Sequence, residues 1–191
     1  MHFTRTQLAG AVAAIGLVVP ATAFAATIDG GPGGERLRGT NRPDTIDGNG
    51  GNDRIRGLGG ADRLNGGAGD DTIFANRGVD VSSGGDGNDV LWALARADVR
   101  PGPHGETDTV ADTLDGGNGD DVLRARDGEA DTITCGPGND RALLDTVDLI
   151  TDATPQNANG SCEVVQRKGP RTSGSRAEDR EERPAARHAR H

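Results

Sequence analysis

Two nine-residue segments, GGAGDDTIF at 66–74 and GGDGNDVLW at 84–92, decide the fold of this 191-residue chain. Both have Gly at the first, second and fourth positions, Asp at the sixth and a large aliphatic residue at the eighth. The spacing recurs in seven consecutive blocks of nine from Gly30 to Trp92, and the sixth position is always acidic: Glu35, Asp44, Asp53, Asp62, Asp71, Asp80 and Asp89. Self-similarity at a short fixed period indicates a solenoid of stacked units.

The repeat continues beyond residue 92 with two interruptions. Its register reaches Asp98, slips through residues 100–105, and returns as TDTVADTLD at 107–115 and GGNGDDVLR at 116–124. One inserted residue precedes DTIT at 131–134, and CGPGNDRAL at 135–143 ends the series. The sequence therefore predicts about eleven repeat units.

Each block combines a glycine-rich turn with a short strand. Glycine takes positive-φ conformations that turn a chain tightly and point its carbonyl oxygens inward. The residues after the sixth position run polar, aliphatic, polar, which suits a strand with one side chain inside. If two blocks form one coil, Glu35, Asp53, Asp71 and Asp89 share one edge of the solenoid, and Asp44, Asp62, Asp80 and Asp98 share the other.

Carboxylates stacked at strand spacing, about 4.8 Å, repel one another unless a cation lies between them. Calcium takes oxygen ligands with tolerant geometry, whereas zinc and copper favour His and Cys. Among the repeats the only His is His104, which falls in the interruption. The turns therefore predict calcium sites, and the pair 66–71 and 84–89 is the best of them. The alternative is solvated surface charge on a metal-free solenoid.

The expected metal-binding residues are the carboxylates Asp44, Asp53, Asp62, Asp71, Asp89, Asp112, Asp121, Asp131 and Asp140, and the turn glycines Gly48, Gly50, Gly66, Gly67, Gly69, Gly84, Gly85, Gly87, Gly116, Gly117 and Gly119. Three other acidic residues are weaker candidates. Glu35 is longer than the Asp of the motif, the block of Asp80 lacks the Gly pair, and the block of Asp98 has no Gly.

The pattern resembles the hemolysin-type (RTX) calcium-binding repeats, Gly-Gly-x-Gly-x-Asp-x-U-x with U a large aliphatic residue. The blocks 66–74, 84–92 and 116–124 match at every defined position, and the resemblance covers residues 30–143. It implies an all-β fold, a parallel β-roll, which is a right-handed β-solenoid of nonapeptide repeats with two nonapeptides per coil. It also implies Ca²⁺ as the cofactor.

The two ends of the chain differ from the repeats. Residues 1–25 combine Arg5, an apolar stretch from Leu8 to Val19 and Ala23-Phe24-Ala25, which predicts a signal peptide cleaved after Ala25. The apolar stretch is too short to span a bilayer. We expect calcium-binding repeats over 26–143, a C-terminal cap over 144–166 that covers the open end of the roll, and a disordered basic tail over 167–191.

Cys135 and Cys162 are the only cysteines. In an exported chain such a pair predicts a disulfide bond, which would tie the cap to the repeats. Two free thiols and an intermolecular bridge are the alternatives. The predicted location is therefore secreted, in the extracellular region.

The composition also excludes several functions. The net charge is −9, and the acidic repeats argue against nucleic acid, which binds clustered Lys and Arg. There is no second apolar segment for membrane insertion and no H-E-x-x-H or G-x-S-x-G motif, so the chain is predicted not to be an enzyme. The strand arginines are interpreted as partial neutralisation of the acidic turns.

The predicted function is a secreted β-roll that folds on binding calcium ions, because its aliphatic core looks too small to offset the conformational entropy of folding. The alternative is a structural or adhesive β-solenoid at the cell surface without a strict calcium requirement. A cell-surface polymer and self-association through the solenoid ends stay open as further partners.

Overall fold

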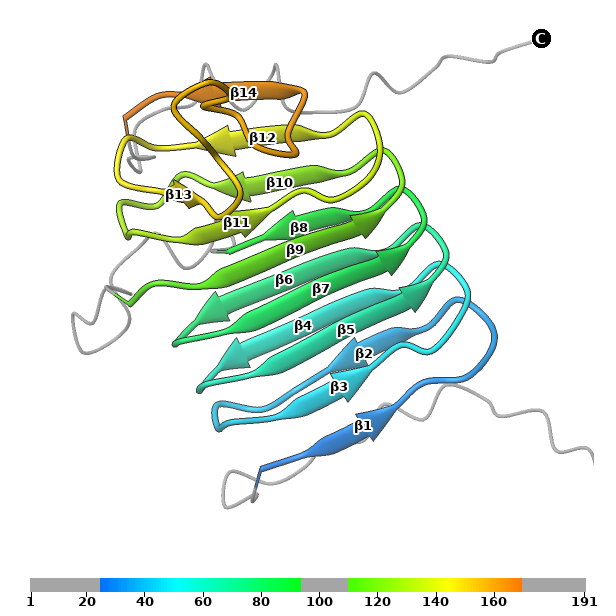
Figure 1. The fold of residues 1–191 in the computed structure, drawn as a ribbon. Coiled ribbons are helices and arrows are strands. Elements are labelled where there is room, and N and C mark those ends of the chain that lie inside the picture. Colours follow the sequence, from blue (N-terminus) through cyan, green and yellow to red (C-terminus); the bar gives the residue numbers. More distant parts are fainter. Residues whose placement is uncertain (1–24, 94–109, 170–191) are drawn as a thin grey trace, which may run out of the picture.

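The structure is a computed structural model that describes residues 25–93 and 110–169, and its regular elements are all strands (Figure 1). They are β1 (Thr27–Asp29), β2 (Arg36–Arg38), β3 (Thr45–Asp47), β4 (Arg54–Gly59), β5 (Arg63–Ala68), β6 (Thr72–Arg77), β7 (Val81–Asp86), β8 (Val90–Trp92), β9 (Thr113–Asn118), β10 (Val122–Ala125), β11 (Thr132–Thr134), β12 (Arg141–Leu144), β13 (Leu149–Ile150) and β14 (Val164–Arg167). Within these two ranges no helix is long and apolar enough to cross a membrane.

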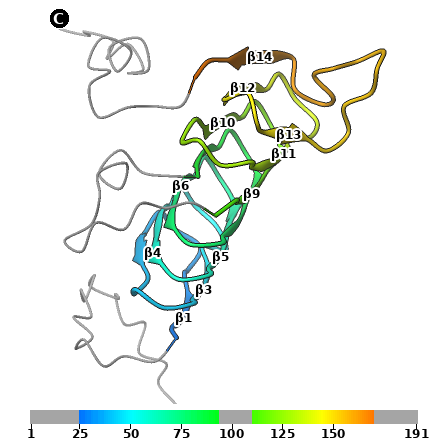
Figure 2. The same ribbon diagram turned by 90° about the vertical axis from the view of Figure 1, so that its left-hand side faces the viewer.

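The strands alternate between two parallel sheets. The odd-numbered strands form one seven-stranded sheet, called here the odd sheet, and the even-numbered strands form the even sheet. Each coil advances the chain by two blocks, so that Ile46 pairs with Leu64 and Ile55 with Ile73. The coils stack as a ladder in Figure 1, and in Figure 2 the two sheets face each other across a narrow interior. The predicted all-β solenoid of two nonapeptides per coil is confirmed.

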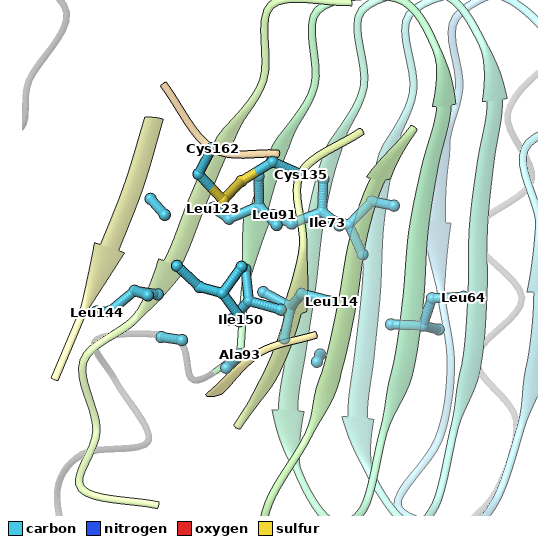
Figure 3. Close-up of a cluster of buried hydrophobic side chains, with 14 of the residues drawn as sticks. Leu64, Ile73, Leu91, Ala93, Leu114, Leu123, Cys135, Leu144, Ile150 and Cys162 are labelled. Atoms are coloured by element: carbon cyan, nitrogen blue, oxygen red, sulfur yellow. A yellow bond between two sulfur atoms is a disulfide. The ribbon is translucent and has the colours of Figure 1, made fainter. Parts of the chain in front are cut away.

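The aliphatic residues of the eighth position fill this interior. Ile73, Leu91 and Leu123 form a buried column on the even sheet, and Leu64 and Leu114 lie on the odd sheet (Figure 3). Successive residues of a strand point to opposite faces. The seventh and ninth positions therefore point outward, and the core consists of the eighth-position side chains together with buried first-position residues such as Ala75, Ala93 and Leu144.

Ser82 interrupts the aliphatic column of the odd sheet. It pairs with Leu64 on one side and Leu114 on the other, is 1% exposed, and its Oγ has no hydrogen-bond partner among the described residues. A buried hydroxyl without a partner costs roughly 1–3 kcal/mol. We therefore expect Ser82→Ala to raise the free energy of unfolding by about 1 kcal/mol in urea titrations with calcium present.

Ser83→Ala is the matched control for this prediction, because Ser83 is the next residue of β7 and points away from the core. It should change the free energy of unfolding by less than about 0.5 kcal/mol. If Ser82→Ala is no more stable than the native chain, the Ser82 hydroxyl must have a hydrogen-bond partner in solution.

The interruption of the repeat leaves the ladder in register. β9 pairs with β7 and β10 pairs with β8, although residues 94–109 separate the strands of each pair in sequence. The backbone N–H of Asp80 donates to Oδ1 of Asp112 at 2.9 Å, so Asp112 holds the place expected for Asp98. Asp98 itself lies outside the described residues, as do residues 1–24 of the predicted signal peptide and residues 170–191 of the predicted tail.

The coils extend past residue 143 into the segment predicted to be a cap. β13 pairs with β11 and β14 pairs with β12, so this segment adds strands to both sheets. The predicted disulfide between Cys135 and Cys162 is present, with 5.2 Å between the Cα atoms (Figure 3). It links the segment that precedes β14 to the turn that precedes β12.

Loss of this disulfide should loosen the last coils. The bridge joins residues 27 positions apart, and closing a loop of that length stabilises a fold by roughly 3–4 kcal/mol in the chain-entropy estimate. The Cys135→Ala, Cys162→Ala variant should lose a comparable free energy of unfolding in calcium. Reducing the native protein with dithiothreitol should give the same loss, and no change in either experiment would contradict the prediction.

Candidate metal centre

Two columns of carboxylates run along the two edges of the solenoid. The odd-to-even column lies in the turns that follow odd strands, at the right of Figure 1, and consists of Glu35, Asp53, Asp71, Asp89, Asp121 and Asp140. The even-to-odd column lies in the opposite turns and consists of Asp44, Asp62, Asp80, Asp112, Asp131 and Asp148. All the Asp residues of both columns are buried. The nine predicted carboxylate ligands thus fall into two stacks. The spacing predicted this for Asp53, Asp71 and Asp89 on one edge and for Asp44 and Asp62 on the other; the edges of the four residues after the interruption come from the structure.

Each carboxylate is held in place by the preceding coil. The backbone N–H of Asp53 donates to Oδ1 of Asp71 at 2.7 Å, and that of Asp71 donates to Oδ1 of Asp89 at 2.8 Å. The same bond recurs along both columns. At the C-terminal end Glu163 and Asp148 supply the last acceptors. One oxygen of each carboxylate therefore has a structural role.

In seven of the column Asp residues the other carboxylate oxygen has no hydrogen-bond partner among the described residues. Oδ2 is buried and accepts no hydrogen bond from the described residues in Asp53, Asp62, Asp71, Asp89, Asp121, Asp131 and Asp140. In the turn 66–71 a Cβ on Gly66 would overlap both Oδ2 of Asp71 and the carbonyl oxygen of Gly84 in the next coil. Glycine at the first position thus allows two oxygens of the type that calcium prefers to lie close together.

Seven turns share one backbone conformation, with positive φ at the second and fourth positions: those that begin at residues 48, 57, 66, 75, 84, 116 and 135. In the turn 66–71 these are Gly67 (φ 103°) and Gly69 (φ 125°). Three turns without a second-position Gly keep the conformation at Asn49 (φ 66°), Leu58 (φ 85°) and Asn76 (φ 81°). Asn tolerates this region of φ, but a bulky aliphatic residue there is strained.

Replacing Leu58 by Gly should therefore stabilise the solenoid. The left-handed conformation costs a residue with a Cβ about 1–2 kcal/mol, and part of that gain is offset by the greater freedom of Gly in the unfolded chain. We expect Leu58→Gly to raise the free energy of unfolding by about 0.5–1 kcal/mol. Leu58→Ala keeps the Cβ and should show no gain. Equal urea midpoints for the two variants would show that φ strain does not limit this turn.

Burial raises the pKa of the column carboxylates. It raises the pKa of Asp62 and Asp89 to about 7 and that of Asp53 and Asp121 to about 6. Neighbouring carboxylates of the same column add to the increase, whereas the N–H bond from the preceding coil lowers the pKa of each. The pKa of Asp71, Asp131, Asp140 and Asp148 is also raised, chiefly by burial. Ionising a column therefore costs free energy unless a cation accompanies it.

A second polar ladder, which the sequence analysis missed, lies beside the odd-to-even column. It occupies the fifth position of successive turns and consists of Asn52, Asp70, Asn88, Asp120 and Asn139. The backbone N–H of Asn88 donates to Oδ1 of Asp70, and the N–H of Asp120 donates to Oδ1 of Asn88, both at 2.9 Å. Asn and Asp alternate, so no two of its carboxylates are adjacent. This strict use of Asn or Asp is a signal that the sequence already contained.

The two edges of the solenoid are not equivalent. In the even-to-odd turns, Ala75 and Ala125 replace the first-position Gly, and Oδ2 of Asp44 accepts the backbone N–H of Thr40. Arg126 is also buried on this edge and donates to the carbonyl oxygen of Gly169 at 3.1 Å. The odd-to-even edge therefore has the more uniform set of glycine turns and unpartnered carboxylate oxygens.

In the described part of the chain, no three His, Cys, Asp or Glu side chains come together as a metal cluster. A metal ion in these turns would need a carboxylate from each of two coils and backbone carbonyl oxygens for its remaining ligands. The turns supply oxygens of both kinds, because a carboxylate oxygen and a carbonyl oxygen of the next coil both lie close to the first-position Gly.

A protein-family profile described as the RTX calcium-binding nonapeptide repeat (4 copies) matches residues 29–64, 56–91 and 107–142. These ranges together cover more than half of the chain and include all nine carboxylates predicted as ligands. Searches of curated proteins and of solved structures gave no significant match.

Proposed function

Since the chain belongs to the family of RTX calcium-binding nonapeptide repeats, we propose that it is a secreted, non-catalytic β-roll that binds Ca²⁺ along its odd-to-even column. The observation that carries the proposal is the unpartnered Oδ2 of Asp53, Asp71, Asp89 and Asp121, each beside the first-position Gly of its own turn. Each ion would lie between two successive turns, starting with 48–53 and 66–71.

The chain's own residues prepare such sites. The N–H bond from the preceding coil fixes each carboxylate through Oδ1, which leaves Oδ2 free to bind a cation. Glycines at positive φ turn the backbone so that carbonyl oxygens line the same edge. A bound Ca²⁺ would supply the positive charge that stacked carboxylates need at neutral pH.

The even-to-odd column is proposed to bind fewer ions. Of its candidate ligands Asp44, Asp62, Asp112 and Asp131, the best placed is Asp62, whose Oδ2 is unpartnered and lies beside Gly57. Secretion is supported by the signal-like residues 1–25 and by the disulfide, because disulfides persist in oxidising compartments. An N-terminus at Ala26, measured by mass spectrometry on protein from the culture medium, would test it.

Equilibrium dialysis with calcium tests the binding sites directly. Asp71→Asn, Asp89→Asn keeps the Oδ1 acceptors but removes two charges from the odd-to-even column, and Asp62→Asn, Asp80→Asn is the matched change on the other edge. We expect the first variant to lose more bound calcium than the second, and magnesium to compete poorly. Native protein that binds no calcium would favour the structural solenoid instead, and equal losses would contradict the assignment to one edge.

A further inference from the structure

The outward face of the even sheet collects the arginines of the strands. Its seventh and ninth positions include Arg36, Arg38, Arg54, Arg56, Arg124 and Arg141, and no Asp or Glu occurs at the outward positions of its described strands. The outward positions of the odd sheet carry Asp29, Asp47 and Asp115 with Arg63. The two faces of the solenoid therefore have opposite charge.

Four of these arginines form a grid on two adjacent strands. Arg36 pairs with Arg54 and Arg38 with Arg56 across β2 and β4. All four are exposed, and none forms an ion pair with a carboxylate within residues 25–93 and 110–169. Like charges directly opposite each other destabilise a sheet. A grid of this kind is stabilised when an anion lies across it.

Two aromatic rings continue the ninth-position row beyond the grid. Phe74 and Trp92 stack with their ring centroids 5.9 Å apart. The guanidinium of Arg54 lies 4.7 Å and that of Arg56 5.4 Å from the centroid of Phe74, and the guanidinium of Arg124 lies 4.6 Å from that of Trp92. The rings thus hold guanidinium groups at both ends of the stack by cation–π contacts.

We propose that this arginine face binds an acidic polysaccharide, whose carboxylates are received by the grid of Arg36, Arg38, Arg54 and Arg56. The guanidinium fork matches a carboxylate through two parallel hydrogen bonds. The four arginines of the grid lie on two adjacent strands, about 4.8 Å apart, and at alternate residues of each strand, about 7 Å apart. A ligand that engages the whole grid must therefore carry repeated negative charges.

Nucleic acids fit this face less well. Single strands bind by stacking bases on open aromatic faces, but the faces of Phe74 and Trp92 are occupied by each other and by arginines. A duplex groove admits a protruding helix or a two-stranded ribbon, whereas this surface is a seven-stranded sheet. An acidic polysaccharide needs neither feature, because its charged groups can be bound from one side.

Biolayer interferometry on immobilised hyaluronan, a uronate polymer, tests the proposal with the purified native chain in calcium and low salt. The test variant is Arg36→Gln, Arg38→Gln, because neither side chain contacts the rings. The matched control is Arg42→Gln, Arg63→Gln, which removes the same charge from exposed positions outside this face. We expect at least tenfold weaker binding for the test variant and less than twofold change for the control. Circular dichroism and calcium affinity should be unchanged in both.

Three results would overturn the proposal. Native protein could fail to bind hyaluronan, or both variants could lose binding equally, which would indicate attraction by net charge alone. The native chain could also bind duplex DNA, single-stranded DNA or anionic lipid vesicles more tightly than hyaluronan. Uncharged dextran is the negative control, and binding to it would show that the arginines are not the determinant.

Discussion

Calcium is expected to convert the chain from a disordered polypeptide in chelator to a β-sheet protein at neutral pH. Without a cation the buried columns must ionise next to one another, against the raised pKa of Asp62 and Asp89, about 7 in each. A ligand at ten times its dissociation constant stabilises the fold by about 1.4 kcal/mol per site. Four sites would then contribute about 6 kcal/mol, comparable to the stability of a whole domain.

Far-UV circular dichroism during a calcium titration measures this conversion. Asp71→Asn, Asp89→Asn should raise the calcium midpoint at least tenfold. Asp29→Asn, Asp115→Asn removes the same charge from the exposed face of the odd sheet and should shift the midpoint less than twofold. Magnesium at equal concentration should not fold the chain. A full β spectrum in chelator, unchanged by calcium, would refute coupled folding.

Lowering the pH should partly replace calcium in stabilising the folded chain, and this is the second large expected effect. A carboxyl whose pKa is higher in the folded chain than in the unfolded chain binds its proton more tightly when folded. Its contribution to stability is complete below about pH 4 and is lost as the pH rises through its folded pKa, which is about 6 for Asp53 and Asp121 and about 7 for Asp62 and Asp89. In chelator, the β signal should therefore be larger at pH 4.5 than at pH 7.5.

With calcium present the same titration should run in the opposite direction. Protons and Ca²⁺ compete for the same carboxylates, so the calcium midpoint should rise as the pH falls from 7.5 to 5. Replacing Asp62 and Asp89 by Asn should flatten the dependence in chelator, because Asn does not titrate. Equal unfolding midpoints at pH 4.5 and 7.5 in chelator would show that the columns are not desolvated in solution.

The features of the fold that depend only on the nine-residue repeat could be predicted from the sequence. An aliphatic residue every nine positions fixes which side chain is inside, and pairing of alternate blocks puts Asp53, Asp71 and Asp89 on one edge. Sequence spacing could not show that the Asp80 coil continues at Asp112. Across an interruption the partner of a strand is decided by the register of whole coils and not by the count of residues between them.

The predicted role of the strand arginines also needed the structure. They were expected to offset the charge of the acidic turns, but Arg36, Arg38, Arg54 and Arg56 lie together on one sheet. Successive blocks belong alternately to the two sheets. The arginines therefore gather on one sheet because the blocks that contain them are alternate ones. The stacking of Phe74 on Trp92 also follows from this alternation, because the two residues hold the same position in blocks one coil apart.

The hydrogen-bonded carboxylate columns give the solenoid a direction. Every column bond runs from the backbone N–H of one coil to a carboxylate oxygen of the following coil, whereas the bonds of the fifth-position ladder run from the later coil to the earlier one. Cutting away the first coil leaves the Oδ1 of the next column carboxylate without its N–H donor, whereas cutting away the coil of Glu163 leaves the N–H of Asp140 without its acceptor. Within the columns, the two ends of the solenoid therefore present different groups: carboxylate acceptors face the N-terminal end, and backbone N–H donors face the C-terminal end.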